Sequence, residues 1–300
     1  DPLFIVEADE YDTAFFDKRS KFIHYKPDVL VINNIEFDHV DIFSNVDQII
    51  WQFHQLLRTL SPQTKVVANG DDLNIQKLFE LGVWSEIDYF GSSVGDKKKW
   101  TCILDDRGQY NLSLNGKKLE SIKSKLFGQH NMLNITAAIA ALANLGLNPR
   151  ELIASAQNFN GVKRRLEYIG QFSNIHLFDD FAHHPTAIKA SMTAMRSKFL
   201  SSQLYAIVEL ASNTMRKGSL RTDLKESFAA ADFVWILDYG DVEWDIQEEF
   251  MGIKNIGIVK NLDDLSHQLW SKLKTDDSLV IMTNKDSVDI RSILVKGPQN

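Results

Sequence analysis

The chain has 300 residues, 44% of them hydrophobic and 24% charged, so it contains enough apolar side chains for a folded core and is long enough for two domains. Its 40 acidic and 33 basic residues give a formal net charge of −7, which argues against a broad surface for nucleic acid or an anionic membrane. The single cysteine, Cys102, excludes an intramolecular disulfide, and no apolar run reaches the ~20 residues of a membrane span, so we expect a soluble, cytoplasmic protein with no obligate protein partner.

The first half of the chain alternates short apolar runs with helical patterns. In chain order, the pattern predicts strands at 3–6, 29–32 and 65–68, a helix at 47–60, and a further helix after the turn at 69–72. Alternating apolar and polar residues between Trp100 and Leu126 predict antiparallel strands. An Ala-rich helix follows Gly128, and the segment from Arg150 to Phe159 closes this half.

The segment Leu3–Val6 has the composition of a buried strand, yet almost nothing precedes it. A parallel strand needs neighbours that are delivered by crossover connections. We therefore expect that an N-terminal portion of the protein precedes Asp1.

The second half repeats a β/α pattern after a short basic segment at 160–165, which is the best candidate for a linker. Strands are predicted at 175–178, 204–208, 233–237, 256–259 and 279–282, with helical segments between them. This alternation indicates a mostly parallel, doubly wound sheet, whose ligands bind at the carboxyl ends of the strands. We therefore expect one domain at 1–161 and a second at 162–300.

Two acidic clusters follow predicted strands of the first domain, at 7–12 and at 36–41. Carboxylates this close repel one another unless a positive charge lies among them, although a solvated loop is the ordinary explanation of such a run. His39 lies within the second cluster. Carboxylate oxygens and an imidazole at adjacent strand ends suit Mg²⁺ or Mn²⁺.

Three further polar groups suggest nucleotide binding. Asn131 and Asn134 lie three residues apart at the start of the Ala-rich helix, and their carboxamides suit a purine edge, whereas a helix cap accounts for only one of them. The cations at 163–165 suit a phosphate group, although basic linkers are common. The segment 179–185 ends a strand with two Asp residues and continues with two His residues, a pattern that also occurs in metallophosphoesterases.

In sequence and in order, these segments resemble the Mur ligase family, whose members are ATP-dependent enzymes that form amide bonds in peptidoglycan precursors. The matching segments are 7–10, 33–39, 128–134, 161–167 and 179–186. Segments 9–22 and 212–215 most resemble the branch that acts in cell-wall recycling. The resemblance implies the remainder of a central ATPase domain, with a mixed sheet and a small antiparallel sheet, followed by a Rossmann-like C-terminal domain.

The resemblance also implies a reaction, cofactors and site residues. The enzyme would join UDP-N-acetylmuramate to the tripeptide L-Ala-γ-D-Glu-meso-diaminopimelate through an acyl phosphate, with ATP and Mg²⁺. Matching positions imply Glu7 and His39 as Mg²⁺ ligands, His130, Asn131 and Asn134 around the adenine, Arg165 at the phosphates, Asp180 at the ribose, His183 and His184 near the reacting phosphate, and Ser212, Asn213, Thr214 and Arg216 at the peptide.

The chain departs from the family pattern at three places. It has no Gly-x-x-x-x-Gly-Lys-[Ser/Thr] loop, which we expect upstream of Asp1, so we expect the chain alone neither to hydrolyse ATP nor to ligate. Relatives carry Pro-Arg at 210–211 and a Gly-rich turn at 284–287, both where the peptide would bind. The alternatives are a UDP-N-acetylmuramate–L-alanine ligase, a metal-dependent phosphoesterase and a non-enzymatic nucleotide-binding module.

Overall fold

The computed structural model describes residues 3–13, 15, 17–95 and 97–297. The chain forms two compact units. Unit 1 comprises Asp1–Lys125 and Gln129–Phe159, and unit 2 comprises Leu126–Gly128 and Asn160–Asn300.

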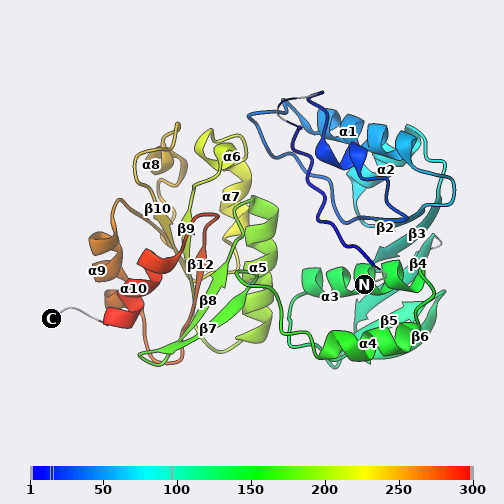
Figure 1. Cartoon of the computed structure of the whole chain (residues 1–300). Helices are drawn as coiled ribbons and strands as arrows, with labels where there is room; N and C mark the ends of the chain where they lie inside the picture. Colours follow the sequence, from blue (N-terminus) through cyan, green and yellow to red (C-terminus); the bar gives the residue numbers. More distant parts are fainter. Residues whose placement is uncertain (1–2, 14, 16, 96, 298–300) are drawn as a thin grey trace. The chain divides into compact units, whose positions relative to one another are not determined.

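Unit 1 is built on one six-stranded sheet whose spatial order follows the sequence, β1-β2-β3-β4-β5-β6 (Figure 1). Its strands are β1 (Val29–Ile32), β2 (Lys65–Asn69), β3 (Glu86–Gly91), β4 (Lys98–Leu104), β5 (Tyr110–Leu114) and β6 (Lys117–Ile122). The first four strands are parallel, and β5 and β6 are added in antiparallel fashion. The predicted antiparallel strands are therefore confirmed, but they extend the main sheet and do not form a separate one.

The tight turn between β5 and β6 shows why these strands pair. Asn115 and Gly116 are the only two residues between the strands, and their φ angles are 50° and 73°. A two-residue hairpin turn of this type requires positive φ at both positions, which Asn and Gly adopt at low cost.

Helices cover both faces of this sheet. They are α1 (Val46–Thr59), α2 (Leu73–Glu80), α3 (Gln129–Ala143) and α4 (Pro149–Gln157), together with the short 3₁₀ helix η1 (Lys21–His24). The buried side chains of η1, α1 and α2 form one core cluster with β1 and β2. Figure 1 shows α3 and α4 on the opposite side of the sheet from α1 and α2, and α3 contacts β1 to β4. The predicted helices of this half are confirmed.

The prediction of a buried strand at Leu3–Val6 is wrong. The segment has no regular secondary structure, and Phe4 and Ile5 are 93% and 85% exposed. A strand forms only where a neighbour satisfies its N–H and C=O groups, and no described strand lies beside these residues. An apolar run alone was therefore not sufficient evidence for a strand.

Unit 2 contains the second six-stranded sheet, in the order β11-β10-β9-β12-β8-β7. Its strands are β7 (Glu167–Phe172), β8 (Ile175–Asp180), β9 (Leu204–Glu209), β10 (Phe233–Leu237), β11 (Ile256–Val259) and β12 (Ser278–Met282). All neighbours are parallel except β7, which pairs with β8 in antiparallel fashion. The five predicted strands are confirmed, and β7 is an addition.

The helices of unit 2 pack on both faces of its sheet. They are α5 (Pro185–Lys198), α6 (Asn213–Arg216), α7 (Arg221–Ser227), α8 (Ile246–Glu249), α9 (Leu262–Lys272) and α10 (Val288–Lys296). Along β9, Ala206 and Val208 join the core cluster of α5, α7 and α8, whereas Tyr205 and Ile207 join that of α9 and α10. Every second side chain thus points to the same face, as strand geometry requires, and the doubly wound architecture is confirmed.

A three-residue segment of unit 2 comes from within the sequence of unit 1. The ring of Phe127 packs edge-on against Phe178, 6.1 Å between centroids, and the ammonium group of Lys198 lies 4.2 Å from the Phe127 ring centre. The chain returns to unit 1 at Gln129, the first residue of α3. The two units are therefore covalently joined at three points.

Two observations bear on the expectations from composition. Cys102 is a free, buried thiol in β4. Among the described helices, none combines the length and the apolar character that crossing a lipid bilayer requires.

Candidate functional site

Two carboxylates and an imidazole meet in unit 1 at a point that suits a metal ion. Asp9, Glu10 and His39 each offer one ligand atom, and these atoms lie within 4.8 Å of one another. His39 follows β1 in a tight loop, with φ of 55°, and its backbone N–H donates to the Asp38 carboxylate over 2.8 Å. Its Nε2 lies 3.2 Å from Glu10 Oε1. Two segments that lie about 30 residues apart in the sequence thus contribute side chains to one cluster of possible metal ligands.

The surroundings of His39 favour its protonated form when no metal is bound. Burial alone lowers the pKa of the imidazole, but the hydrogen bond to Glu10 and the charges of Asp38, Glu10 and Asp9 outweigh it and raise the pKa above its usual value. The ring also lies against Tyr11, with 4.1 Å between the ring centroids. A divalent cation would take over the role of the proton, since it neutralises the same carboxylates.

The oxygen-rich donor set fits Mg²⁺ or Mn²⁺. His39, one of the two predicted ligands, lies in this group with Asp9 and Glu10, and its role as a metal ligand stays a prediction. Glu7, the predicted second ligand, is exposed and outside the group. Sequence reasoning identified the acidic cluster at 7–12 and did not select these two carboxylates from it.

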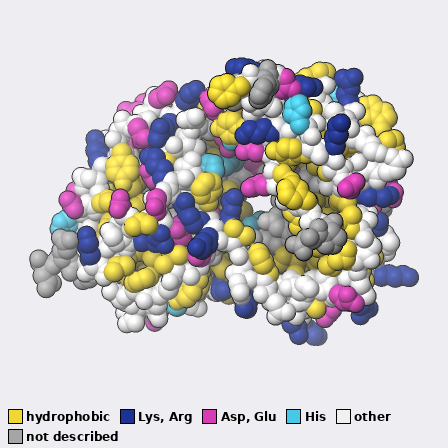
Figure 2. Space-filling model, in the orientation of Figure 1, with side chains coloured by type: hydrophobic (Ala, Val, Ile, Leu, Met, Phe, Trp, Pro, Cys, Tyr) yellow, Lys and Arg dark blue, Asp and Glu magenta, His cyan; other side chains and the backbone are white. Residues whose placement is uncertain are grey.

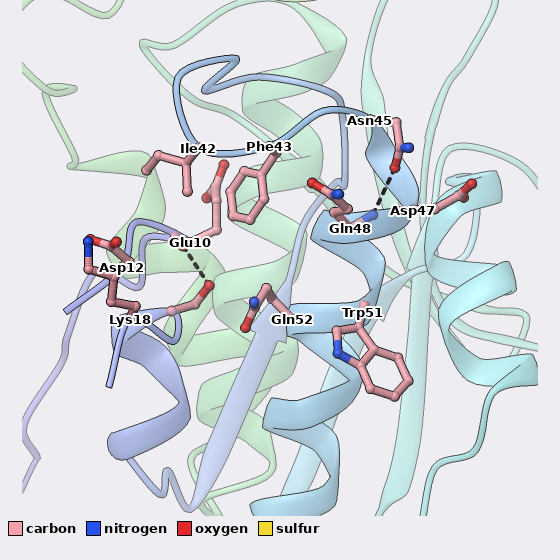
Figure 3. Close-up of a pocket in the computed structure, with 11 residues that line it drawn as sticks. Glu10, Asp12, Lys18, Ile42, Phe43, Asn45, Asp47, Gln48, Trp51 and Gln52 are labelled. Atoms are coloured by element: carbon pink, nitrogen blue, oxygen red, sulfur yellow. Dashed lines mark hydrogen bonds between the residues drawn. The ribbon is translucent and has the colours of Figure 1, made fainter. Parts of the chain in front are cut away.

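A pocket of about 440 Å³ adjoins this group, because Glu10 belongs to both. In Figure 3, Glu10, Asp12 and Lys18 of the N-terminal segment lie across the pocket from Gln48 of α1. The Ser20 hydroxyl donates to the Glu10 carbonyl over 2.6 Å and fixes the N-terminal wall. With three carboxylates against one ammonium group among its lining residues, the pocket disfavours an anion that arrives without a cation.

The predicted adenine residues lie together on the first turns of α3. Gly128, with φ of 88°, turns the chain into this helix. Asn134 Oδ1 accepts a hydrogen bond of 2.8 Å from Asn33 Nδ2, which connects α3 to the end of β1. His130 is partly buried, and desolvation lowers the pKa of its imidazole, so its neutral form is favoured. Asn131 and Asn134 therefore occupy the same end of one helix, and Asn33 is a partner that the sequence did not indicate.

Asp180 ends β8 in a buried position of unit 2. Its Oδ1 accepts from the Ala182 N–H over 2.9 Å, and its Oδ2 accepts from the Ser191 hydroxyl over 2.7 Å. Burial raises the pKa of this carboxyl, against the lowering effect of these bonds and of the Arg165 charge. Both oxygens are thus engaged within unit 2, and Arg165 is close enough for its charge to act on Asp180.

The paired histidines after β8 have different local environments. His183 Nδ1 lies 2.9 Å from the Phe181 carbonyl oxygen. His184 is the N-cap of α5, where its Nδ1 accepts from the Thr186 N–H over 3.3 Å, and Pro185 occupies the first helical position. Because Nδ1 of His184 is an acceptor, a neutral ring carries its proton on Nε2.

The basic residues 163–165 do not act as one group. Arg164 donates to the carbonyl oxygens of Thr283 and Lys285, and so it holds the turn after β12. The guanidinium groups of Arg164 and Arg165 lie 5.1 and 5.4 Å from the Phe181 ring centre. The two differ in their carboxylate neighbours, because Arg164 lies 3.7 Å from Asp179 and the Arg165 charge acts on Asp180.

The predicted peptide residues lie in the loop after β9. Ser212 caps the short helix α6 by accepting from the Met215 N–H, Asn213 is exposed, and Thr214 is buried. Arg216 pairs with Asp241 over 2.8 Å. Within unit 2, Arg165, Asp180, His183 and His184 thus lie at the end of β8, and Ser212 to Arg216 lie at the same end of β9.

The charged side chains are mixed over the visible surface. Figure 2 shows Lys and Arg among Asp and Glu on the face drawn. This view agrees with the acidic net charge and indicates that an anionic ligand requires a local site.

Comparison with known proteins identifies the family. Residues 2–142 match the Mur ligase middle domain, and residues 164–284 match the Mur ligase, glutamate ligase domain. The chain therefore belongs to the Mur ligase family.

The curated relatives include ligases of the recycling branch. The chain is 36% identical over 298 residues to UDP-N-acetylmuramate–L-alanyl-γ-D-glutamyl-meso-2,6-diaminoheptandioate ligase of Escherichia coli K12, an alignment that covers 98% of this chain and 64% of the relative. The corresponding ligase of Haemophilus influenzae is 36% identical over 291 residues, covering 94% and 62%. The chain thus spans somewhat less than two thirds of these relatives.

A solved structure supports the same placement. A murein peptide ligase of Psychrobacter arcticus superposes with a TM-score of 0.69 at 33% identity, over 96% of this chain and 61% of that one. UDP-N-acetylmuramate–alanine ligase of Thermotoga maritima has a TM-score of 0.67 at 21% identity, which shows the shared fold.

Proposed function

We propose that the chain is the nucleotide-binding and amide-forming part of an ATP-dependent ligase that joins UDP-N-acetylmuramate to L-Ala-γ-D-Glu-meso-diaminopimelate in the cytoplasm. The observation that carries this proposal is the 36% identity over 98% of the chain with the E. coli ligase named for these substrates. The five motif segments that suggested the family all lie inside this alignment range.

The proposed reaction has two steps that balance. The muramate carboxylate attacks the γ-phosphorus of ATP, which yields an acyl phosphate and ADP. The amine of the peptide then attacks the acyl carbon, and inorganic phosphate leaves as the amide forms. Both steps bring anions together, so catalysis depends on positive charge and hydrogen-bond donors at fixed positions.

We propose that His39, with Asp9 and Glu10, holds the Mg²⁺ ion, and Glu7 remains a further predicted ligand. When bound, this ion supplies positive charge to the phosphate oxygens. The geometry that supports the assignment is the 4.8 Å limit within which the three ligand atoms of Asp9, Glu10 and His39 lie. The carboxylates also fix the orientation of the His39 ring through Glu10.

The remaining residues bind and orient the nucleotide and the peptide. We assign Asn131 and Asn134, with His130, to the adenine, and Arg165 and Asp180 to the phosphates and the ribose. His183 and His184 are assigned to the reacting phosphate, and Nδ1 of His184 caps α5. Ser212, Asn213, Thr214 and Arg216 are assigned to the peptide.

The second candidate is ligation of L-alanine to UDP-N-acetylmuramate. It is supported by relatives such as the Desulfitobacterium hafniense enzyme, which is 29% identical over 241 residues. The higher identity and longer alignment with the tripeptide ligases favour the tripeptide.

The phosphoesterase alternative required one site made of both acidic-histidine clusters. The first cluster belongs to unit 1, and Asp179, Asp180, His183 and His184 belong to unit 2. Among the described residues, Asp9, Glu10 and His39 form the only group of this kind whose ligand atoms lie close enough to share a metal ion. This alternative and the non-enzymatic module therefore have no specific observation in their favour.

The test is calorimetric titration of the chain with ATP and Mg²⁺. Asn134→Ala should weaken binding about tenfold, since it removes a proposed hydrogen bond to the adenine. Asn33→Ala is the matched control, because it removes the same Asn33–Asn134 bond and leaves the Asn134 carboxamide in place. Equal losses in both variants, or no nucleotide binding by the wild-type chain, would contradict the proposal.

A further inference from the structure

The loop after β1 carries residues from two parts of the proposed nucleotide site. Asn33, directly after the strand, donates to Asn134 of α3, and His39, further along, belongs to the group of possible metal ligands. Between them lies Ile35, whose side chain is 1% exposed and joins the core cluster of α1 and α2. A contact that fixes Ile35 therefore restricts the positions that Asn33 and His39 can take.

Two side chains at the start of α2 hold both backbone polar groups of Ile35. The Ile35 N–H donates to Asp72 Oδ2 over 3.2 Å, and Asn74 Nδ2 donates to the Ile35 carbonyl oxygen over 2.7 Å. We call these two contacts the Ile35 clamp. Because β1 and β2 are parallel neighbours, the chain leaves both strands at the same edge of the sheet, so α2 begins beside the loop that it holds.

Asp72 makes one contact more than a helix cap requires. Its Oδ1 accepts from the Ile75 N–H over 2.8 Å, which is the ordinary N-cap contact of α2. Asn148 makes the equivalent contact for α4, through its Oδ1 to the Arg150 N–H over 3.0 Å. A cap needs one oxygen, and Asn caps a helix about as well as Asp. The second oxygen of Asp72 thus serves the loop after β1, and an amide nitrogen there could not accept from an N–H group.

The loop is also restrained on either side of the clamp. Asn33 is held to α3 by its bond of 2.8 Å with Asn134. The His39 carbonyl oxygen accepts from the N–H groups of Ile42 and Phe43 over 2.8 and 2.9 Å, so a tight turn follows directly. The clamp lies between these restraints and joins the loop to α2. A loop that is ordered before its ligand arrives reduces the entropic cost of binding.

We propose that Asp72 and Asn74 are positioning residues that hold His39 in place for a divalent cation. They act through the backbone of Ile35 and are not themselves ligands. The inference rests on the proposed function, in which His39 belongs to the Mg²⁺ site. Groups that orient metal ligands commonly contribute about 10- to 100-fold to metal affinity, so loss of the clamp weakens the binding of the cation.

The test measures the affinity of the chain for Mn²⁺, from the electron paramagnetic resonance signal of the free ion, together with the melting temperature. Asp72→Asn keeps an oxygen for the cap of α2 and loses the acceptor for Ile35, so Mn²⁺ affinity should fall about tenfold. Asp72→Ala should lose the same affinity and melt at a lower temperature, because it loses the cap as well. Asn74→Ala, which changes no charge, should also weaken Mn²⁺ binding.

Two control variants separate positioning from stability and from charge. Asn148→Ala removes the cap of α4, so it should lower the melting temperature and leave Mn²⁺ affinity unchanged. Asp71→Asn removes the neighbouring charge, whose carboxylate accepts from the Ser92 N–H over 2.6 Å, and it should also leave Mn²⁺ affinity unchanged. If either control loses as much affinity as Asp72→Asn, a general effect of stability or charge is responsible and the proposal is overturned.

Hydrogen exchange of single amides, followed by NMR, tests the clamp itself. The Ile35 amide should exchange faster in Asp72→Asn than in the wild-type chain, whereas the Ile75 amide, which retains its cap, should not. Unchanged exchange at Ile35 overturns the proposal. If the wild-type chain binds no Mn²⁺, the proposed metal site fails and this inference fails with it. If the wild-type chain and Asp72→Asn bind Mn²⁺ equally well, this inference fails and the proposed metal site stands.

Discussion

Burial sets the chemical behaviour of two single side chains in unit 1. Cys102 is 1% exposed within β4, and His130 is partly buried near the start of α3. Desolvation disfavours the charged form of each group, the thiolate in one case and the imidazolium in the other. Each consequence can be measured in the chain.

Cys102 should resist alkylation while the chain is folded. Burial raises the pKa of its thiol to about 11, with a smaller opposing effect from Thr136, so at pH 8 only about 0.1% is the reactive thiolate. Mass spectrometry after iodoacetamide treatment should find no adduct until urea unfolds the protein. Rapid labelling of the folded chain would contradict the buried position.

His130 should make the chain less stable as the pH falls. Because burial depresses the pKa of the folded imidazole below its unfolded value of about 6.5, the unfolded state binds the proton more tightly. Stability is full above pH 6.5 and is lost as the pH falls from there towards the folded pKa. His130→Gln should reduce the drop in melting temperature between pH 7.5 and pH 5.

The control for this titration is His267→Gln, which removes an exposed histidine of α9. This variant should retain the pH dependence of the wild-type chain. If the melting temperature of His130→Gln decreases between pH 7.5 and pH 5 as much as that of the wild-type chain, groups other than His130 cause the decrease.

At the scale of elements, glycines in the loops of unit 2 show where close packing is required. Gly218 follows α6 with φ of 68°, and a Cβ added there would lie 2.6 Å from Trp244 Cδ1. Gly240, in the loop after β10, has φ of 85° and open space around it. The two positions share the backbone strain and differ in the contact.

Gly218→Ala should therefore destabilise the chain more than Gly240→Ala. In both variants the positive φ should lower the free energy of unfolding by about 1 kcal/mol. Gly218→Ala should lower it by about 1–3 kcal/mol more, because the added methyl group overpacks against Trp244. Urea denaturation measures both. An equal decrease in the free energy of unfolding in the two variants would mean that the Trp244 ring can move away from the added methyl group at no energetic cost.

The elements that the sequence predicted are those with a clear apolar period. The parallel strands of unit 2 are continuous apolar runs because both of their faces are buried, and each was predicted. Strand β3 was not predicted, because Glu86 and Asp88 interrupt its run of apolar residues. The buried carboxylate of Asp88 is paired with two donors, since its Oδ2 lies 2.7 Å from Lys99 Nζ and 3.0 Å from Asn144 Nδ2. These partners are distant in the sequence, so a local pattern cannot reveal them.

The site was predictable as a set of clusters and less so as individual contacts. The sequence indicated both His39 and the acidic segment 7–12. The selection of Glu10 depends on the path of the chain, which turns so that Tyr11 packs on His39. The Ile35 clamp was likewise invisible, because it joins two loops that are distant in sequence and adjacent at one edge of the sheet.

At the scale of the whole molecule, the division into units does not follow the sequence. Phe127 lies in the first half of the chain and packs in unit 2, against Phe178 and Lys198. Phe159, at the boundary with unit 2, is 47% exposed.

Phe127→Ala should therefore weaken unit 2 and leave unit 1 unchanged. The loss of a partly buried ring should cost about 2 kcal/mol. Hydrogen exchange measured by mass spectrometry should show faster exchange in β8 and α5 and no change in β1 or β2. Phe159→Ala is the control and should alter neither unit, and faster exchange in unit 1 after Phe127→Ala would contradict the assignment.

The path of the chain through Leu126–Gly128 also ties the start of α3 to unit 2. One residue, Gly128, separates Phe127, whose ring packs in unit 2, from Gln129, where α3 begins. A single residue spans at most about 3.6 Å, so this connection has no spare length. The helix that bears His130, Asn131 and Asn134 therefore starts within two residues of a side chain that is anchored in the core of the other unit.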